Sequence, residues 1–382
     1  MSRFGLCTVL SLFASETMAA SREEPSVSFS ASYLGEVWSV RDGGMATGER
    51  YLDQLDLAVE ADLETLVGWR GATAFAQGLY NNGESLTEDL LGDFQVVSNI
   101  DGGGPARIYQ LWLEQRLLND RASVRAGLYD INSEFDTTET GGLFINGSHG
   151  MGVDFGQTGV NGPSIYPVTG LAVRGEFKLT ETWALRAVVA EGVPGNPDRP
   201  GRTGFNLDED EGALLVLETS YQDDRHKVAL GGWRYTAEHE PFGEPMGAGN
   251  DGVYALAESR LTGEAGGPGV SAVVRVGRAN SAFNPIEYYL GAGVSYTGPF
   301  AARPQDQLGV AIAWATLGAP FIEAEALAGS DLAPREVAVE LTYRAVLNEY
   351  VSVQPDVQYV FNPGGRDDDD ALVVGLRFEV TY

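Results

Sequence analysis

The chain has 382 residues and a formal net charge of −29, with 54 acidic against 25 basic residues. This excess of carboxylates excludes nucleic acid as a partner, because phosphate contacts require clustered Lys and Arg. Only Lys178 and Lys227 among the basic residues are lysines. The arginine bias favours polar recognition, since a guanidinium presents a rigid planar set of donors.

The N-terminal segment predicts a secretory signal peptide over residues 1–19. One basic residue precedes an apolar stretch over 4–14, and the small-residue site Thr17-Met18-Ala19 follows it. We expect residues 20–382 to form a single exported domain. The sole cysteine, Cys7, leaves with the signal, so disulfides and thiolate metal sites are excluded from the mature chain. No metal or other cofactor is expected.

Apolar and polar residues alternate along most of the remaining chain. At 371–382 the even-numbered positions are apolar or aromatic, whereas Arg377, Glu379 and Thr381 are polar. A period of two predicts strands. No apolar run reaches the roughly 18 residues of a membrane-spanning helix, but barrel strands need only about 9–11. The pattern predicts about 16 strands, at 26–40, 52–63, 69–80, 107–117, 122–131, 170–178, 182–191, 212–221, 226–237, 252–261, 270–279, 287–297, 307–316, 335–345, 349–361 and 371–382.

The connections between these strands alternate between short and long. The long set comprises 81–106, 132–169, 192–211, 238–251, 317–334 and 362–370, with shorter members at 41–51 and 280–286. Outer-membrane barrels have short turns on one rim and long loops on the other. We therefore predict an all-β, transmembrane antiparallel β-barrel with both termini on the short-turn side. Aromatic residues suited to membrane girdles lie near strand ends, at Trp69, Trp183, Tyr343, Tyr359 and Tyr382.

A soluble tandem β-sandwich is the structural alternative, and the signal peptide and terminal aromatic residue disfavour it. Pro355 lies inside a predicted strand and lacks the N–H that a strand ladder needs, which predicts a local bulge. Small residues on the predicted inner faces indicate open space or a filler such as an inserted loop; they are Ala72, Ala74, Ala76, Gly309, Ala311 and Ala313.

The connection at 132–169 contains the glycine-rich stretch "GGLFINGSHGMGVDFGQTGVNGPSIYPVTG". Loops of this length are uncommon in compact domains unless they serve a function. The block from Gly127 to Arg174, which includes this stretch, resembles the OprB-type carbohydrate-selective porins of Gram-negative outer membranes. A second block, Glu336 to Tyr382, is similar to that family's terminal strands and contains "QPDVQYVFNPGG". The resemblance implies a water-filled barrel, passive diffusion of sugars, and a third loop folded into the lumen.

Selectivity in a porin comes from pore width and from the polar groups at its narrowest part. If Tyr109, Leu111 and Leu113 meet lipid, alternation turns Gln110 and the next polar residues of that strand inward. We expect a sugar-binding constriction formed by Trp112, Glu114, Arg116, Arg125, Arg174 and Glu176, with the loop acids Glu134, Asp136 and Asp154 as partners. Each alone could be an ordinary solvated lumen residue, but the cluster favours sugar contact.

The closing strands and the last long connection add further polar groups. The closing strands supply the lumen-lining residues Glu340, Gln354, Asp356, Gln358 and Arg377. The acidic run Asp367–Asp370 is interpreted as a solvated loop tip, with divalent-cation bridging to lipopolysaccharide as the alternative. The expected partners are mono- or small oligosaccharides, outer-membrane lipid and lipopolysaccharide, and the barrel assembly machinery acting through the C-terminal strand.

Three other functions are alternatives to a sugar channel. An enzyme is disfavoured because His149, His226 and His239 lie in separate turns and loops and no G-x-S-x-G elbow occurs. A general or cation-preferring diffusion porin stays open, since an acidic lumen attracts cations. A structural or adhesion barrel would have a plugged lumen.

Overall fold

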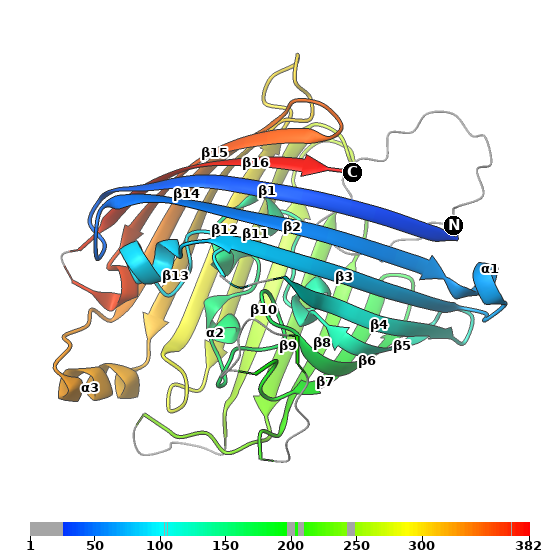
Figure 1. Cartoon of the computed structure of the whole chain (residues 1–382), viewed down its shortest axis with the longest axis horizontal. Helices are drawn as coiled ribbons and strands as arrows, with labels where there is room; N and C mark the ends of the chain where they lie inside the picture. The colour runs from blue at the N-terminus through cyan, green and yellow to red at the C-terminus, as the bar shows by residue number, and fades with distance from the viewer. Residues whose placement is uncertain are drawn as a thin grey trace.

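Antiparallel strands form one closed 16-stranded barrel in the computed structural model, where β1 (Val27–Asp42) is hydrogen-bonded to both β2 (Gly48–Asp62) and β16 (Ala371–Thr381) (Figure 1). The structure describes residues 26–102, 104, 106–196, 203–204, 210–242, 249–367 and 369–382. The predicted signal peptide lies outside them. The other strands are β3 (Ala72–Gly83), β4 (Arg107–Leu117), β5 (Ala122–Tyr129), β6 (Gly170–Lys178), β7 (Trp183–Glu191), β8 (Ala213–Gln222), β9 (His226–Tyr235), β10 (Asp251–Arg260), β11 (Gly269–Ala279), β12 (Ile286–Thr297), β13 (Gln307–Leu317), β14 (Arg335–Val346) and β15 (Val351–Phe361).

The predicted fold class is confirmed, and each predicted strand has a counterpart. Strands adjacent in sequence are adjacent in the barrel. The first residues of β1 and the last residues of β16 lie at the same end of it, the end that carries the helix α1 (Leu63–Val67) of a short turn (Figure 1). Apolar residues of β16 such as Leu376 and Phe378 are exposed on the outer face. No helix in the described part of the chain is long and apolar enough to span a membrane.

The inner face of β3 differs from the prediction. Phe75 lies inside, with its ring stacked on Trp112 at 4.9 Å between centroids, and Gln77 donates to Asp56 Oδ1 at 2.9 Å. Ala72, Ala74 and Ala76 alternate with these inward residues and so lie on the outer face. The prediction that they face the lumen is wrong. Alternation was ambiguous here because phenylalanine and alanine are both apolar.

Tyr109 also lies inside rather than facing lipid. The pairing of β3 with β4 shifts by one residue between Gln77 and Gly78, so both Tyr109 and Gln110 are buried. The Tyr109 hydroxyl donates to Asp130 Oδ2 at 2.7 Å. A β-bulge turns consecutive side chains to one face, which a strict period of two does not anticipate.

The bulge predicted at Pro355 is absent. Pairing between β14 and β15 is interrupted opposite the proline, but the register of Thr342 with Asp356 continues unchanged to Ala345 with Val353. Pro355 also keeps its place opposite Leu376 of β16. The missing N–H thus removes hydrogen bonds without inserting a residue.

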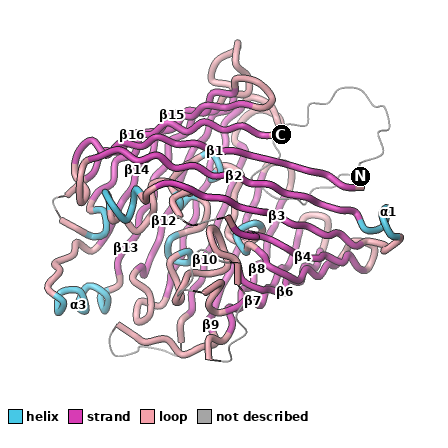
Figure 2. Tube along the Cα trace, viewed as in Figure 1, coloured by secondary structure: helices cyan, strands magenta, loops and turns pink. Residues whose placement is uncertain are grey.

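Two long connections fold into the barrel interior (Figure 2). We call them loop 2 (residues 84–106) and loop 3 (residues 130–169). They pair through Asn99 N to Ile145 O and Gly147 N to Val96 O, both 2.8 Å. Their short helical segments are Thr87–Leu91, Ile131–Ser133, Gly141–Leu143, Gly147–His149 and α2 (Val153–Gly156), whereas α3 (Ala319–Ala328) and Pro363–Gly365 belong to later connections.

Glycine on the inner wall makes room for the tip of loop 3. A Cβ at Gly309 would lie 2.8 Å from Leu143 and from Phe144, and one at Gly293 would lie 2.7 Å from Phe144. The space predicted at Gly309, Ala311 and Ala313 is therefore occupied by the inserted loop.

Candidate functional site

Ionisable side chains project inward from successive strands of one half of the barrel. From β7 to β11 the charges alternate in sign from one strand to the next. The desolvation cost of each buried charge is therefore offset by an opposite charge on a neighbouring strand. We call this set the charged belt; its members are Glu114, Arg125, Arg174, Glu176, Arg186, Glu218, Lys227, Glu258 and Arg275.

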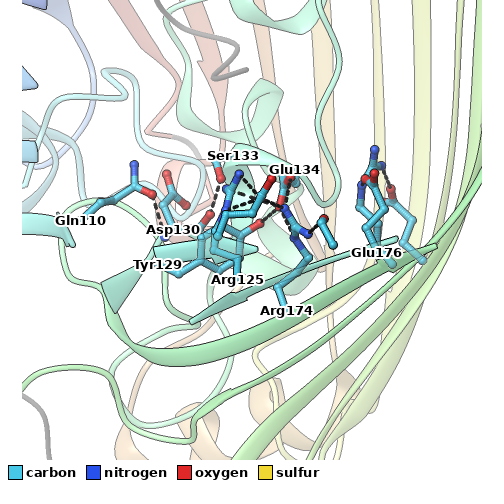
Figure 3. A network of polar contacts seen from close by, with 12 residues as sticks. Gln110, Arg125, Tyr129, Asp130, Ser133, Glu134, Arg174 and Glu176 are labelled. Carbon is cyan, nitrogen blue, oxygen red and sulfur yellow. Dashed lines mark hydrogen bonds and ion pairs between the residues drawn. The ribbon is translucent and has the colours of Figure 1, made fainter. Parts of the chain in front are cut away.

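Arg174 lies at the centre of a network formed by β4, β5, β6 and loop 3 (Figure 3). Its guanidinium binds both oxygens of Glu134, at 2.8 Å and 2.9 Å, and Glu114 Oε2 at 2.7 Å. A further bond of 2.6 Å goes to Ser123 Oγ. The Arg174 side chain is 2% exposed, against 16% for Glu114 and 19% for Glu134. The two carboxylates are therefore partly accessible from the lumen, whereas Arg174, which binds both of them, is buried against the barrel wall.

Arg125 completes the network and joins it to an aromatic pair. Its Nε and Nη2 donate to Glu114 Oε2 at 3.0 Å and 2.8 Å, and Nη1 lies 3.6 Å from Glu134 Oε2. The guanidinium carbon sits 3.8 Å from the centroid of the Trp112 ring. The site thus combines ion-paired carboxylates, a guanidinium and a buried aromatic pair that packs against it.

Glu134 is the member of this network that loop 3 supplies. It also accepts from the Tyr129 hydroxyl. Burial alone would raise the pKa of Glu134, but the charges of Arg125 and Arg174 outweigh it and lower that pKa to about 2. A carboxyl whose pKa is lowered on folding stabilises the folded site above its ordinary pKa and loses this contribution as the pH falls.

For the sugar site predicted from the sequence, we therefore expect glucose binding to be constant between neutral pH and about pH 4–5, and to decline as the pH approaches the pKa of Glu134. The measurement is the block of single-channel current by glucose as a function of pH. A Glu134→Gln variant should show the weakened block already at pH 7. A decline centred near the ordinary glutamate pKa in the unmodified chain would contradict this expectation.

Beyond Glu134, loop 3 follows the charged belt around the wall. Asp136 N donates to Glu218 Oε2 at 3.0 Å, and the Lys227 ammonium donates to Thr137 O at 2.6 Å. The N–H groups of Glu139 and Thr140 then donate to the two oxygens of Glu258, at 2.8 Å and 2.7 Å. The belt thus fixes the course of the loop mainly through its backbone.

The closing strands hold the loops in the same way. Glu340 accepts from the N–H groups of Ile145 and Asn146, at 2.6 Å and 3.1 Å. Glu336 accepts from those of Phe94 and Gln95, at 2.9 Å and 3.0 Å. A carboxylate that receives consecutive N–H groups satisfies donors that would otherwise be buried unpaired. We call Glu258, Glu336 and Glu340 the glutamate clamps.

The predicted site residues divide into three groups. Trp112, Glu114, Arg125, Arg174 and Glu134 lie together in the network described above. Glu176 pairs with Arg186 at 2.7 Å, and Arg116 with Asp120 at 3.8 Å. Asp136 and Asp154 bind Arg275 instead of Arg125 or Arg174.

The predicted lumen-lining residues face inward, but the loops cover most of them. Glu340, Gln354, Asp356 and Gln358 are buried. Gln354 donates to Leu143 O at 2.8 Å and Gln358 to Val97 O at 2.9 Å. Arg377 binds Glu36 and donates to Asn99 Oδ1 at 2.5 Å.

Sequence reasoning missed several residues that determine this geometry. Lys227, Glu258 and Arg275 lie on strands whose alternation was recognised, so their inward direction could have been inferred. The entry of loop 2 and the pairing of Arg275 with loop 3 had no such signal. No cluster of three or more potential metal ligands occurs among the described residues.

Comparison with known proteins agrees with this geometry. The family model described as "Carbohydrate-selective porin, OprB family" matches residues 46–382. Porin B of Pseudomonas aeruginosa is 28% identical, over 94% of this chain and 88% of that protein. A high-pH structure of Pseudomonas putida OprB has a TM-score of 0.83 at 22% identity, with 94% of each chain covered. A low-pH structure of the same protein has a TM-score of 0.60 at 18% identity, covering 94% of this chain and 93% of that one. The chain belongs to the OprB family of carbohydrate-selective porins and is a channel of the outer membrane.

Proposed function

We propose that mono- and small oligosaccharides cross this barrel by passing Glu114, Glu134, Arg125 and Trp112, with Arg174 positioning the two carboxylates. The arrangement of two accessible carboxylates on one buried guanidinium carries this proposal. Sugar hydroxyls donate to carboxylates and accept from guanidinium groups. Trp112, whose ring contacts both Phe75 and the Arg125 guanidinium, supports Arg125 at the edge of this path.

The other predicted residues are assigned supporting roles. We propose that Arg116 and Glu176 line the path on the short-turn side of the constriction. Asp136 and Asp154 act through loop 3, and Glu340, Gln354, Asp356, Gln358 and Arg377 hold the inserted loops at the closing strands. The contacts described above support the roles given to Asp136, Asp154 and the closing-strand residues.

Liposome swelling tests the proposal directly. Vesicles that contain the full chain should swell rapidly with glucose, more slowly with larger sugars, and more slowly with amino acids than with a monosaccharide of similar size. Equal swelling by all of these solutes would reject sugar selectivity. No swelling would reject an open channel.

A cation-preferring diffusion porin is the second candidate, favoured by the net charge of −29. Much of the acidic side-chain charge inside the barrel is paired with arginine or bound to backbone N–H groups. Reversal potentials in a salt gradient distinguish the candidates. Strong cation selectivity together with sugar-independent conductance would favour the general porin.

We infer that the chain has no catalytic activity. His226 Nδ1 lies 2.8 Å from Ser259 Oγ, but this pair is exposed at the barrel rim. Ser148 Oγ donates to Gln95 O rather than to His149. Among the residues that the structure describes, neither pair has the buried orienting acid that activates a serine nucleophile.

Contacts outside the pore are further proposals. We propose that the outer face contacts lipid and lipopolysaccharide, and that the assembly machinery recognises the C-terminal strand. Within the run Asp367–Asp370, Asp370 accepts from Asn362 N at 3.1 Å and from the Tyr359 hydroxyl at 3.3 Å, which supports a structural role for that carboxylate. Asp368 lies outside the described residues.

A further inference from the structure

Arg275 on β11 joins the two legs of loop 3. On the outgoing leg, its Nε and Nη2 bind the two oxygens of Asp136 at 3.1 Å and 2.7 Å. On the returning leg, its Nη1 binds Asp154 Oδ1. The side chains of Arg275, Asp136 and Asp154 are 8%, 1% and 0% exposed, so these groups hold the loop and do not contact the solute.

Two glycines leave the space that this arrangement needs. A Cβ at Gly152 would lie 2.2 Å from Arg275 Cζ, and a Cβ at Gly277 would lie 2.0 Å from Asp154 Oδ2. Gly152 has φ −59° and ψ 135°, a conformation open to any residue. Glycine is therefore required there for space and not for backbone conformation.

Aromatic residues enclose the guanidinium and connect it to the loop and the belt. Arg275 Cζ lies 5.4 Å from the Tyr254 ring centroid and 5.2 Å from that of Tyr289. The Tyr289 hydroxyl donates to Ser148 O at 2.8 Å. That of Tyr254 donates to Glu218 Oε2 at 2.7 Å, the same oxygen that accepts from Asp136 N. A movement of Arg275 would disturb all of these contacts together.

We propose that Arg275 is a positioning residue that sets the size limit of the channel by holding both legs of loop 3 against the wall. Asp136 lies two residues beyond Glu134, the loop member of the sugar-facing network, so fixing Asp136 fixes how far Glu134 projects into the pore. The effect of Arg275 on the size of the sugar that passes rests on the proposed function. Its effect on pore width does not depend on which solute crosses.

The test uses three variants of the full chain. Arg275→Met removes the guanidinium but leaves two buried carboxylates without a partner, which endangers folding. Arg275→Met/Asp136→Asn/Asp154→Asn removes the charges together. Gly277→Ala keeps every charge and displaces Asp154. Gly175→Ala is the matched control, because a Cβ at Gly175 would meet no atom within 4 Å. Heat-modifiable gel mobility establishes that each barrel is folded.

In the triple variant and in Gly277→Ala, we expect a roughly twofold or greater rise in single-channel conductance in potassium chloride, because a displaced loop 3 widens the pore. The ratio of disaccharide to monosaccharide swelling should rise as well. A merely destabilising change would reduce the number of folded channels without altering either per-channel quantity. Unchanged conductance and an unchanged ratio in both folded variants would overturn the proposal. The two proposals can fail separately. If the wild-type channel shows no sugar selectivity but the variants still have raised conductance, the proposed function is rejected and the role of Arg275 in pore width is retained.

Discussion

Replacing Arg174 with alanine is expected to weaken sugar binding by roughly 10- to 100-fold, which corresponds to the loss of about 1.5–3 kcal/mol from a charge-assisted hydrogen-bond network. The physical reason is that Glu114 and Glu134 share this guanidinium, and without it only Arg125, at 3.6 Å from Glu134, joins the two carboxylates. The measurement is the glucose concentration that half-blocks single-channel current. Arg125→Ala should weaken the block in the same direction, because Arg125 also binds Glu114.

A control variant separates this effect from a general loss of positive charge. Arg278 pairs with Glu287 at 3.5 Å, and its side chain is 62% exposed, so Arg278→Ala should leave the block unchanged. Arg174→Lys should recover the block only in part, since an ammonium lacks the planar fork that binds both acids. Sugar affinity that stays at the wild-type level in both Arg174→Ala and Arg125→Ala would exclude this site.

Replacing Glu336 with alanine is expected to release loop 2. Glu336 accepts from Phe94 N, Gln95 N and also Gly364 N, the last at 2.6 Å. Leaving these donors buried and unpaired costs about 1–3 kcal/mol each, more than a local loop conformation withstands. We expect faster cleavage within loop 2 by a glutamate-specific protease and larger fluctuations of open-channel current.

Glu379→Ala is the matched control for the Glu336 variant. Glu379 is another inward carboxylate of the closing strands, but it binds Arg344 at 2.6 Å and Ser352 Oγ at 3.1 Å rather than a loop. Its removal should alter neither loop cleavage nor current noise. If Glu336→Ala leaves loop 2 as resistant to protease as the wild type, the clamp is not what holds the loop.

The strands were predictable because successive residues of a barrel strand point alternately to lipid and to the interior. Apolar and polar side chains therefore alternate along the sequence. The inward directions of Glu114, Arg125 and Arg174 followed from that period. Prediction from this period failed at two inward-facing residues. At Phe75 an aromatic residue fills the interior, and at Tyr109 a bulge turns two consecutive side chains inward.

The interior loops could not be predicted in the same manner. The glycine-rich composition of loop 3 indicated an irregular segment, and its position inside the barrel was implied by family resemblance alone. Contacts such as Arg275 with Asp154 join residues far apart in the chain, and nothing in their local sequence selects one carboxylate as the partner. The entry of loop 2 depends on Glu336, whose environment appears only once the barrel is closed.

The glutamate clamps have a consequence for how this channel can change over evolution. Glu258, Glu336 and Glu340 hold loops through main-chain N–H groups, which every residue except proline possesses. The main-chain contacts of the clamps therefore do not depend on the identity of the clamped residues, even where a side chain such as that of Thr140 or Asn146 adds a contact of its own. Evolution or protein engineering could therefore change which solutes pass the channel by substituting exposed loop residues, while the barrel and the clamps stay unchanged.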